Sequence, residues 1–113
     1  METEIHTTDG TMDLNTELIK HPVSTFYVRA TGTSMIGAGI HPDDLLIVDR
    51  SLEPVDKKVI IAVVNGELTV KRLRLRGDRA FLEAENEGYP PIEITGNMEF
   101  SVWGVVTYAI HSL

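Results

Sequence analysis

Short runs of β-branched, aromatic and other apolar residues follow one another along the chain from Phe26 onward, and turn-forming residues separate them. Runs of this length, bounded by Gly, Pro, Asn and Asp, are typical of β-strands. We therefore predict a mostly β fold, a single compact domain of short antiparallel strands. The predicted strands are Phe26–Ala30, Leu45–Asp49, Val59–Val64, Glu67–Leu75, Ala80–Glu83, Ile92–Ile94 and Phe100–Ile110.

The dipeptide Asn65-Gly66 separates two of these runs and is the clearest local signal in the sequence. A two-residue type I′ turn needs positive φ at both central positions, which Asn and Gly tolerate best. The pattern predicts a tight hairpin with Ile60 opposite Lys71. Because side chains alternate along a strand, Lys71 then shares its face with Leu73 and Leu75. The other face takes Arg72, Arg74 and Arg76, so Lys71 alone among these basic residues is expected on the apolar side.

The first 24 residues differ in character from the rest of the chain. Met1–Asp13 is rich in Thr, Glu and Asp, with too few large apolar groups to offset the entropy of ordering it. Leu14–Ile19 can form one helical turn, which His21-Pro22 would end because a proline disfavours helix in the residue before it. We expect a partly flexible arm over residues 1–24 and one folded domain over residues 25–113.

Composition limits the possible classes of protein. The chain has 113 residues, 42% of them hydrophobic, which suits one domain with a real core. A formal charge of −7 argues against a broad nucleic-acid surface, so we expect no direct sequence-specific DNA binding. No cysteine is present, which excludes disulfides and thiol chemistry. Neither a membrane span nor a secretion signal is visible, and we expect a cytoplasmic protein without a membrane anchor.

Ser34 and Lys71 are the candidate catalytic residues. A serine hydroxyl needs a base, and a lysine amine can serve only if desolvation lowers its pKa so that it loses its proton. Lys71 on an apolar strand face meets that condition. Gly32, Gly37 and Gly39 would let the backbone turn sharply around Ser34 and leave amide N–H groups free for an oxyanion. The plainer alternative is that Ser34 is only a turn residue and Lys71 extends its amine to water.

Five ordered segments resemble the catalytic domain of the LexA/UmuD self-cleaving serine proteases. Two upstream segments, Leu18–Pro22 and Thr25–Val28, resemble the UmuD branch rather than the LexA repressors, as does Asp13-Leu14-Asn15. The resemblance extends from about Leu14 to the C-terminus. The five segments are Ala30–Ile40 (ATGTSMIGAGI), Asp43–Asp49 (DDLLIVD), Gly66–Leu73 (GELTVKRL), Asn86–Ile92 (NEGYPPI) and Trp103–Val106 (WGVV).

The resemblance implies that Ser34 is the nucleophile, that Lys71 is the general base and that backbone N–H groups of Thr33 and Ser34 bind the oxyanion. The chain departs from the family pattern at Thr33, where aspartate is frequent, but this position would act through its backbone. Family members cut themselves at an Ala-Gly or Cys-Gly bond upstream of the serine. No such dipeptide precedes Ser34. We therefore expect that the substrate arm has already been removed, as in the shortened form, UmuD′.

The function that the resemblance implies lies in the SOS response to DNA damage. There, a RecA–single-stranded DNA filament promotes self-cleavage of the UmuD-type protein. The shortened homodimer then joins a UmuC-like polymerase to form the error-prone translesion enzyme, DNA polymerase V. An alternative is the C-terminal self-cleavage domain of a LexA-like transcriptional repressor. A non-enzymatic β-barrel binding module, in which Ser34 and Lys71 never meet, is also compatible with the pattern.

Other polar residues are expected to be structural. The histidines His6, His21, His41 and His111 stand singly, without the close spacing typical of metal ligands, so we expect no metal and no cofactor. Asp43, Asp44 and Asp49 are interpreted as part of a solvated turn. The basic residues between Lys71 and Arg79 are interpreted as a solvated strand face, although a patch for DNA or an acidic partner is the alternative. The strand Phe100–Ile110 could be core or a dimer-forming strand.

Overall fold

The computed structural model describes residues 3–4 and 11–113, so most of the expected flexible segment Met1–Asp13 lies outside the described residues. The mostly β, antiparallel fold is confirmed. Every predicted strand is present, with ends within one residue of those expected. The strands are β1 (Thr25–Arg29), β2 (Leu45–Asp49), β3 (Val59–Val64), β4 (Glu67–Arg76), β5 (Arg79–Glu83), β6 (Ile92–Glu93) and β7 (Phe100–Ile110).

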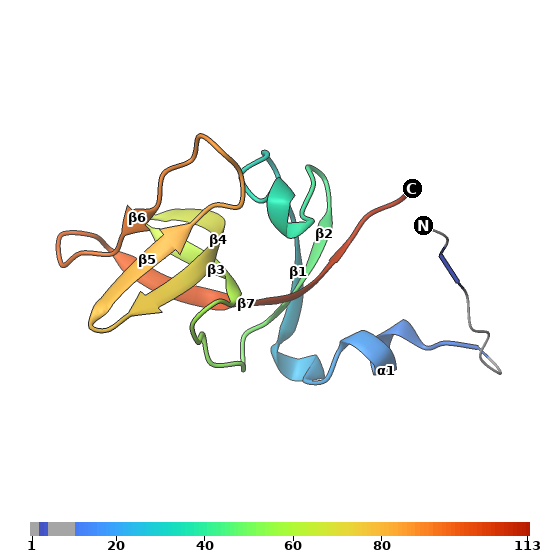
Figure 1. Ribbon diagram of the computed structural model, residues 1–113. Helices are drawn as coiled ribbons and strands as arrows, with labels where there is room; N and C mark the ends of the chain where they lie inside the picture. The colour runs from blue at the N-terminus through green and yellow to red at the C-terminus, as the bar shows by residue number, and fades with distance from the viewer. Residues whose placement is uncertain (1–2, 5–10) are drawn as a thin grey trace.

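The strands form one sheet in the order β1-β2-β7-β3-β4-β5-β6, and every neighbouring pair is antiparallel. The long strand β7 crosses the whole molecule and connects its two halves (Figure 1). Its first part pairs with β3 and its second part with β2, with register shifts at Ile61/Ala62 and Ile47/Val48. Gly104 and Val105 in the middle of β7 are buried, whereas the strand's C-terminal part from Thr107 to Ile110 is exposed, so the strand is only partly core and a dimer-forming role for it stays a prediction.

The buried apolar side chains form two groups. The first surrounds Leu46 and Val48 of β2 and includes Met35 and Ile40 from the segment that follows β1. The second surrounds Ile60 of β3, Leu73 of β4 and Leu82 of β5. Met35 directly follows Ser34 and is only 3% exposed, so the serine turn is held in place by a residue of the core.

The helical turn that was expected over Leu14–Ile19 is present and ends one residue earlier. Helix α1 (Leu14–Leu18) is capped by the side chain of Asp13, which accepts a hydrogen bond from the N–H of Asn15. A 3₁₀ turn, η1 (Pro22–Ser24), begins at the proline that was expected to end the helix. None of the residues of α1 is buried, although His21 contacts Asp49 of β2. No helix among residues 3–4 and 11–113 is long and apolar enough to cross a membrane.

The predicted hairpin between β3 and β4 is confirmed in turn type and in register. Asn65 and Gly66 have φ values of 49° and 84°, as a type I′ turn requires. Val64 pairs with Glu67 and Ile60 pairs with Lys71. Ile60 is fully buried, so the cross-strand neighbour of Lys71 is apolar, as the sequence indicated.

Candidate active site

The fold brings Ser34 and Lys71 into direct contact, although 37 positions separate them in the sequence. Lys71 lies in β4, and Ser34 lies in the turn between β1 and the 3₁₀ helix η2 (Ile36–Ala38). The Nζ atom of Lys71 donates a hydrogen bond to Ser34 Oγ over 3.1 Å. Both side chains are half-buried. The alternative in which these two side chains never meet is therefore wrong.

Lys71 is held by two further acceptors. Its Nζ atom donates to Thr69 Oγ1 over 2.9 Å and to the carbonyl oxygen of Val70 over 3.1 Å. An ammonium group has three N–H donors, whereas a neutral amine has two and a lone pair. When Lys71 is neutral, its two N–H groups can remain on Thr69 and Val70 while the lone pair faces Ser34 Oγ. The arrangement thus orients the amine toward the serine hydroxyl.

Burial lowers the pKa of the Lys71 amine from its ordinary value of 10.5, because desolvation penalises the ammonium form. Among residues 11–113, no carboxylate forms an ion pair with Lys71 that would oppose this effect. The lysine therefore loses its proton more readily than a lysine in water. This is the property that a general base requires.

Backbone N–H groups around the serine are free to bind an anion. Ile36 and Gly37 use their N–H groups on Thr33 and Glu85 carbonyls. Within the described part of the chain, the N–H groups of Thr33 and Ser34 donate to no other group. Gly32 and Gly39, on either side, have φ values of 77° and 83°, which a residue with a Cβ rarely adopts. The turn thus presents unpaired donors next to the Ser34 hydroxyl.

A pocket of about 250 Å³ opens beside Ser34. Its walls come from the end of β1, the serine turn and the start of β4, and they include the apolar side chains of Val28, Met35 and Val70. Ser34 itself is part of the wall.

The segment that follows β5 supports the serine turn, a role that the sequence pattern did not indicate. The N–H of Glu85 donates to the Ser34 carbonyl over 2.8 Å, and the Gly37 N–H donates to the Glu85 carbonyl over 2.6 Å. Asn86 Nδ2 donates to the Thr33 carbonyl over 2.8 Å. Asn86 belongs to the resembling segment Asn86–Ile92, but Glu85 lies just outside it and carried no signal in the sequence.

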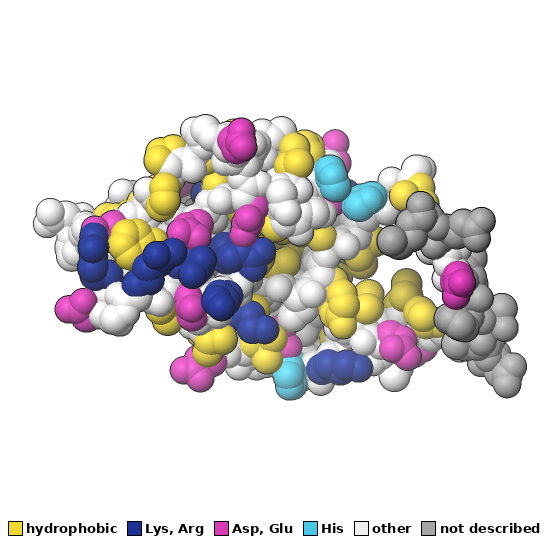
Figure 2. Space-filling view, viewed as in Figure 1, with side chains coloured by type: hydrophobic (Ala, Val, Ile, Leu, Met, Phe, Trp, Pro, Cys, Tyr) yellow, Lys and Arg dark blue, Asp and Glu magenta, His cyan; other side chains and the backbone are white. Residues whose placement is uncertain are grey.

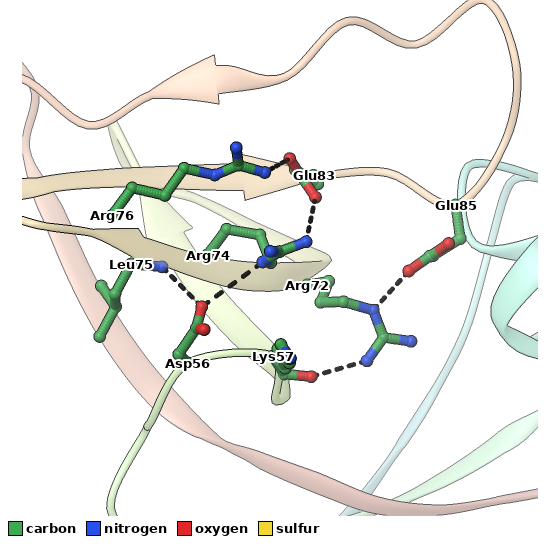
Figure 3. A network of polar contacts seen from close by, with 8 residues as sticks. All are labelled: Asp56, Lys57, Arg72, Arg74, Leu75, Arg76, Glu83 and Glu85. Atoms are coloured by element: carbon green, nitrogen blue, oxygen red, sulfur yellow. Dashed lines mark hydrogen bonds and ion pairs between the residues drawn. The ribbon is translucent and has the colours of Figure 1, made fainter.

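The arginines of β4 and β5 are paired with carboxylates, and Figure 3 shows the network around three of them. Arg72 contacts Glu85, Arg74 contacts Asp56 and Glu83, and Arg76 also contacts Glu83. Arg79 forms a bidentate pair with Glu93. Acidic side chains lie among the basic ones on this face in Figure 2. The pairing favours the structural interpretation, and the Arg72–Glu85 pair also fixes the segment under the serine turn.

The interpretation of three aspartates as a solvated turn is correct for Asp43 but wrong for Asp44 and Asp49, which are 1% and 4% exposed. Both carboxylates face into the fold, where Asp49 has several hydrogen-bond donors and Asp44 has one. Asp44 accepts from the N–H of His41. Burial raises the pKa of Asp49, but hydrogen bonds from Ser51 and His21 outweigh this and hold its pKa below the ordinary value.

Comparison with known proteins identifies the family. The sequence pattern of the Peptidase S24-like family matches residues 1–107. This chain belongs to that family. Protein SamA of Salmonella typhimurium is 41% identical over 104 residues, which cover 92% of this chain and 71% of SamA. Protein ImpA of Escherichia coli is 42% identical over 100 residues, covering 88% and 68% of the two chains.

The LexA repressor of Colwellia psychrerythraea is 37% identical over 93 residues, which cover 81% of this chain and 44% of the repressor. Membership of the Peptidase S24-like family makes this chain a protein of the self-cleaving serine peptidase kind. Its resemblance to the LexA/UmuD proteases is confirmed, and its relatives place it with the UmuD-type mutagenesis proteins as well as with LexA. The family match includes both the Ser34 turn and Lys71.

Gly37 provides a test of how the serine turn is supported. A Cβ at this position would lie 2.5 Å from the backbone oxygen of Glu85, which cannot move aside as a side chain could. Gly37→Ala is therefore expected to separate the turn from residues 85–86 and to lower the free energy of unfolding by about 1–3 kcal/mol in urea denaturation. Gly96→Ala is the control, because a Cβ there meets no atom within 4 Å. Equal stability of the two variants would contradict this account.

Proposed function

We propose that this chain is a UmuD′-like accessory subunit of an error-prone translesion DNA polymerase of the polymerase V type. It retains a Ser34–Lys71 dyad that cleaves the chain's own N-terminal arm. Following the boundaries predicted from sequence, we assign residues 1–24 to a partly flexible N-terminal segment, which is distinct from the substrate arm because it has no Ala-Gly or Cys-Gly bond, and residues 25–113 to the peptidase domain. The contact between Lys71 Nζ and Ser34 Oγ carries the catalytic part of the proposal. The SamA and ImpA similarities support the UmuD-type part.

The reaction follows from the positions of these groups. Neutral Lys71 accepts the proton of the Ser34 hydroxyl as Oγ attacks the carbonyl carbon of the scissile peptide bond. The resulting oxyanion is stabilised by the N–H groups of Thr33 and Ser34. When the C–N bond breaks, Lys71 returns the proton to the departing amine. The acyl ester on Ser34 is then hydrolysed by a water molecule that Lys71 deprotonates.

The proposal includes the partners that the family resemblance implies. A RecA–single-stranded DNA filament would promote the cleavage, and a homodimer of the product would bind a UmuC-like polymerase in the cytoplasm. The protein would not recognise a DNA sequence itself. Consistent with this, the formal charge is −7 and the arginines of β4 and β5 are paired with carboxylates.

The second candidate function is the self-cleavage domain of a LexA-like repressor, because the chain is 37% identical to a LexA repressor. The same Ser–Lys chemistry would serve there to inactivate the repressor. The two functions differ in what the protein does after cleavage. A polymerase subunit has a task in DNA synthesis, whereas a separated repressor domain does not.

A mutagenesis assay distinguishes these functions. The chain is expressed in a bacterium that lacks its own UmuD-type protein but has a UmuC-type polymerase. We expect ultraviolet-induced mutation frequency to rise above that of the empty vector, and the chain to co-purify with the polymerase. A matched strain without the polymerase should show no rise. An unchanged mutation frequency without co-purification would contradict the subunit role and favour the repressor fragment.

A further inference from the structure

Two histidines and an aspartate that are far apart in the sequence meet at one end of the sheet. His41 lies between η2 and β2, Asp44 lies directly before β2, and His111 directly follows β7. The Nδ1 atom of His111 is 3.5 Å from Asp44 Oδ2, and that of His41 is 3.8 Å from the same oxygen. The two imidazole rings lie edge to face with centroids 5.0 Å apart. Figure 2 shows two histidine side chains side by side at the surface.

The carboxylate at this place lacks the partners that its burial requires. The side chain of Asp44 is 1% exposed. Its Oδ2 atom accepts a hydrogen bond from the N–H of His41 over 2.8 Å, whereas Oδ1 has no hydrogen-bond partner among the described residues. Within residues 11–113, only the two histidines, and no lysine or arginine, are close enough to Asp44 to form an ion pair. A buried carboxylate is costly unless a positive charge compensates it.

We propose that His41, Asp44 and His111 bind a divalent transition-metal ion of the zinc type. Imidazole nitrogen and carboxylate oxygen are ligands that suit such ions. One ligand atom from each residue lies within 4.8 Å of the others. Ligand atoms around a tetrahedral ion are roughly 3.3 Å apart, given metal–ligand distances near 2.0–2.2 Å. Small rotations of the exposed rings would close the difference.

The exposure of the three side chains fits such a site. The histidine side chains are 50% and 44% exposed, so an ion between them would reach solvent and keep a position for water. The aspartate supplies the buried, negatively charged side of the site. A pocket lined by Asp44, Ile110 and His111 lies next to this place. The ion would supply the positive charge that Asp44 lacks.

A metal ion here would connect the C-terminal end of β7 to the segment that follows the Ser34 turn. Asp44 lies at the end of that segment, and the backbone there is bonded to Ala30, which precedes the turn: the Ala30 N–H donates to the Asp44 carbonyl over 2.8 Å and the Asp43 N–H donates to the Ala30 carbonyl over 2.9 Å. The ion is therefore expected to stabilise the fold. This inference does not depend on the proposed polymerase role or on the dyad.

The test is titration of the full chain with Zn²⁺ alone at neutral pH by calorimetry, with Co²⁺ absorption as a second signal. The parent is His6→Ala/His21→Ala, which leaves His41 and His111 as the only histidines. We expect one ion per monomer and a higher melting temperature with Zn²⁺. Changes outside the ligand shell already cost about 10–100-fold in affinity, so His111→Ala in this background should cost at least about 100-fold.

Asp44→Asn provides a second variant that keeps the shape of the side chain and removes its charge. Its affinity for Zn²⁺ should fall as well, with circular dichroism showing an intact fold in both variants. If the three side chains do not form a metal site, the parent will bind no Zn²⁺ at neutral pH. That result would overturn the proposal, as would equal affinity of the parent and His111→Ala, or one ion shared by two chains.

Discussion

Lys71→Arg is expected to lower peptide cleavage by about 10²–10⁴-fold, the range that a positioned general base contributes. Arginine remains protonated at all accessible pH values and cannot accept the Ser34 proton. Lys71→Ala should lose as much, because it removes the base altogether. The assay uses an arm fusion: this chain with Ser34→Ala, preceded by an arm that contains an Ala-Gly bond. The arm fusion cannot cut itself through Ser34, so an added enzyme variant must cut it.

Arg76→Ala is the matched control for these two variants. Arg76 lies in the same strand as Lys71 and is largely exposed, and its one ion pair among the described residues is with Glu83 at 3.8 Å. Its removal should leave cleavage of the arm fusion unchanged. Cleavage by Lys71→Arg at the rate of the unmodified chain would show that another group removes the serine proton.

Cleavage is expected to rise about tenfold for each unit of pH and then to level off as Lys71 becomes neutral. Below its pKa, the neutral fraction of an amine increases tenfold per pH unit, and only this fraction can accept the Ser34 proton. Burial lowers the Lys71 pKa, so the plateau should begin below 10.5, the ordinary value for lysine. Rates of arm-fusion cleavage over a range of pH measure this directly.

The contribution of Lys71 to the free energy of unfolding should also increase as the pH rises. The pKa of Lys71 is lower in the folded chain than in the unfolded chain, so the folded state is favoured most above the unfolded pKa. That contribution is lost as the pH falls through the folded pKa. Lys71→Met removes this part of the pH dependence of unfolding.

A cleavage rate that is flat over the same range would contradict the role of Lys71 as base.

The β3–β4 hairpin could be predicted to the residue because its determinants are local. Asn65-Gly66 specifies the turn, and alternation along the strands then fixes the register and the face of Lys71. The strands β2, β3 and β7 have the predicted ends for the same reason. Both signals, the alternation of apolar and polar residues and the turn-forming residues, lie within a few positions of the strand that they specify.

Of the candidate site, the sequence could predict only the serine hydroxyl and the lysine amine, and not the residues that position them. Ser34 and Lys71 were candidates because a serine in a glycine-bounded turn and a lysine on an apolar face are unusual. Thr69 and Glu85, which position Lys71 and the serine turn, have no such signal in the sequence. A threonine in a strand and an acidic residue in a loop are ordinary there. Their contacts depend on which loops the sheet brings together.

The grouping of His41, Asp44 and His111 could not be predicted from spacing. The histidines were expected to stand singly because no two of them have a spacing along the chain that is typical of metal ligands. His111 is 67 positions from Asp44, so spacing could not indicate their contact. The antiparallel pairing of β2 with β7 places the end of β7 beside the start of β2. The burial of Asp44 was likewise invisible, because an aspartate before a strand is usually solvated.

The most direct test of the Ser34–Lys71 dyad is mass spectrometry of the arm fusion after mixing with the unmodified chain, from neutral to alkaline pH. Our account predicts two fragments whose masses place the cut at the Ala-Gly bond, with a yield that grows with pH. An otherwise identical mixture, in which the added chain also carries Ser34→Ala, should leave the fusion intact. Equal cleavage in both mixtures, or an intact fusion in both even when a RecA filament is added, would contradict the dyad.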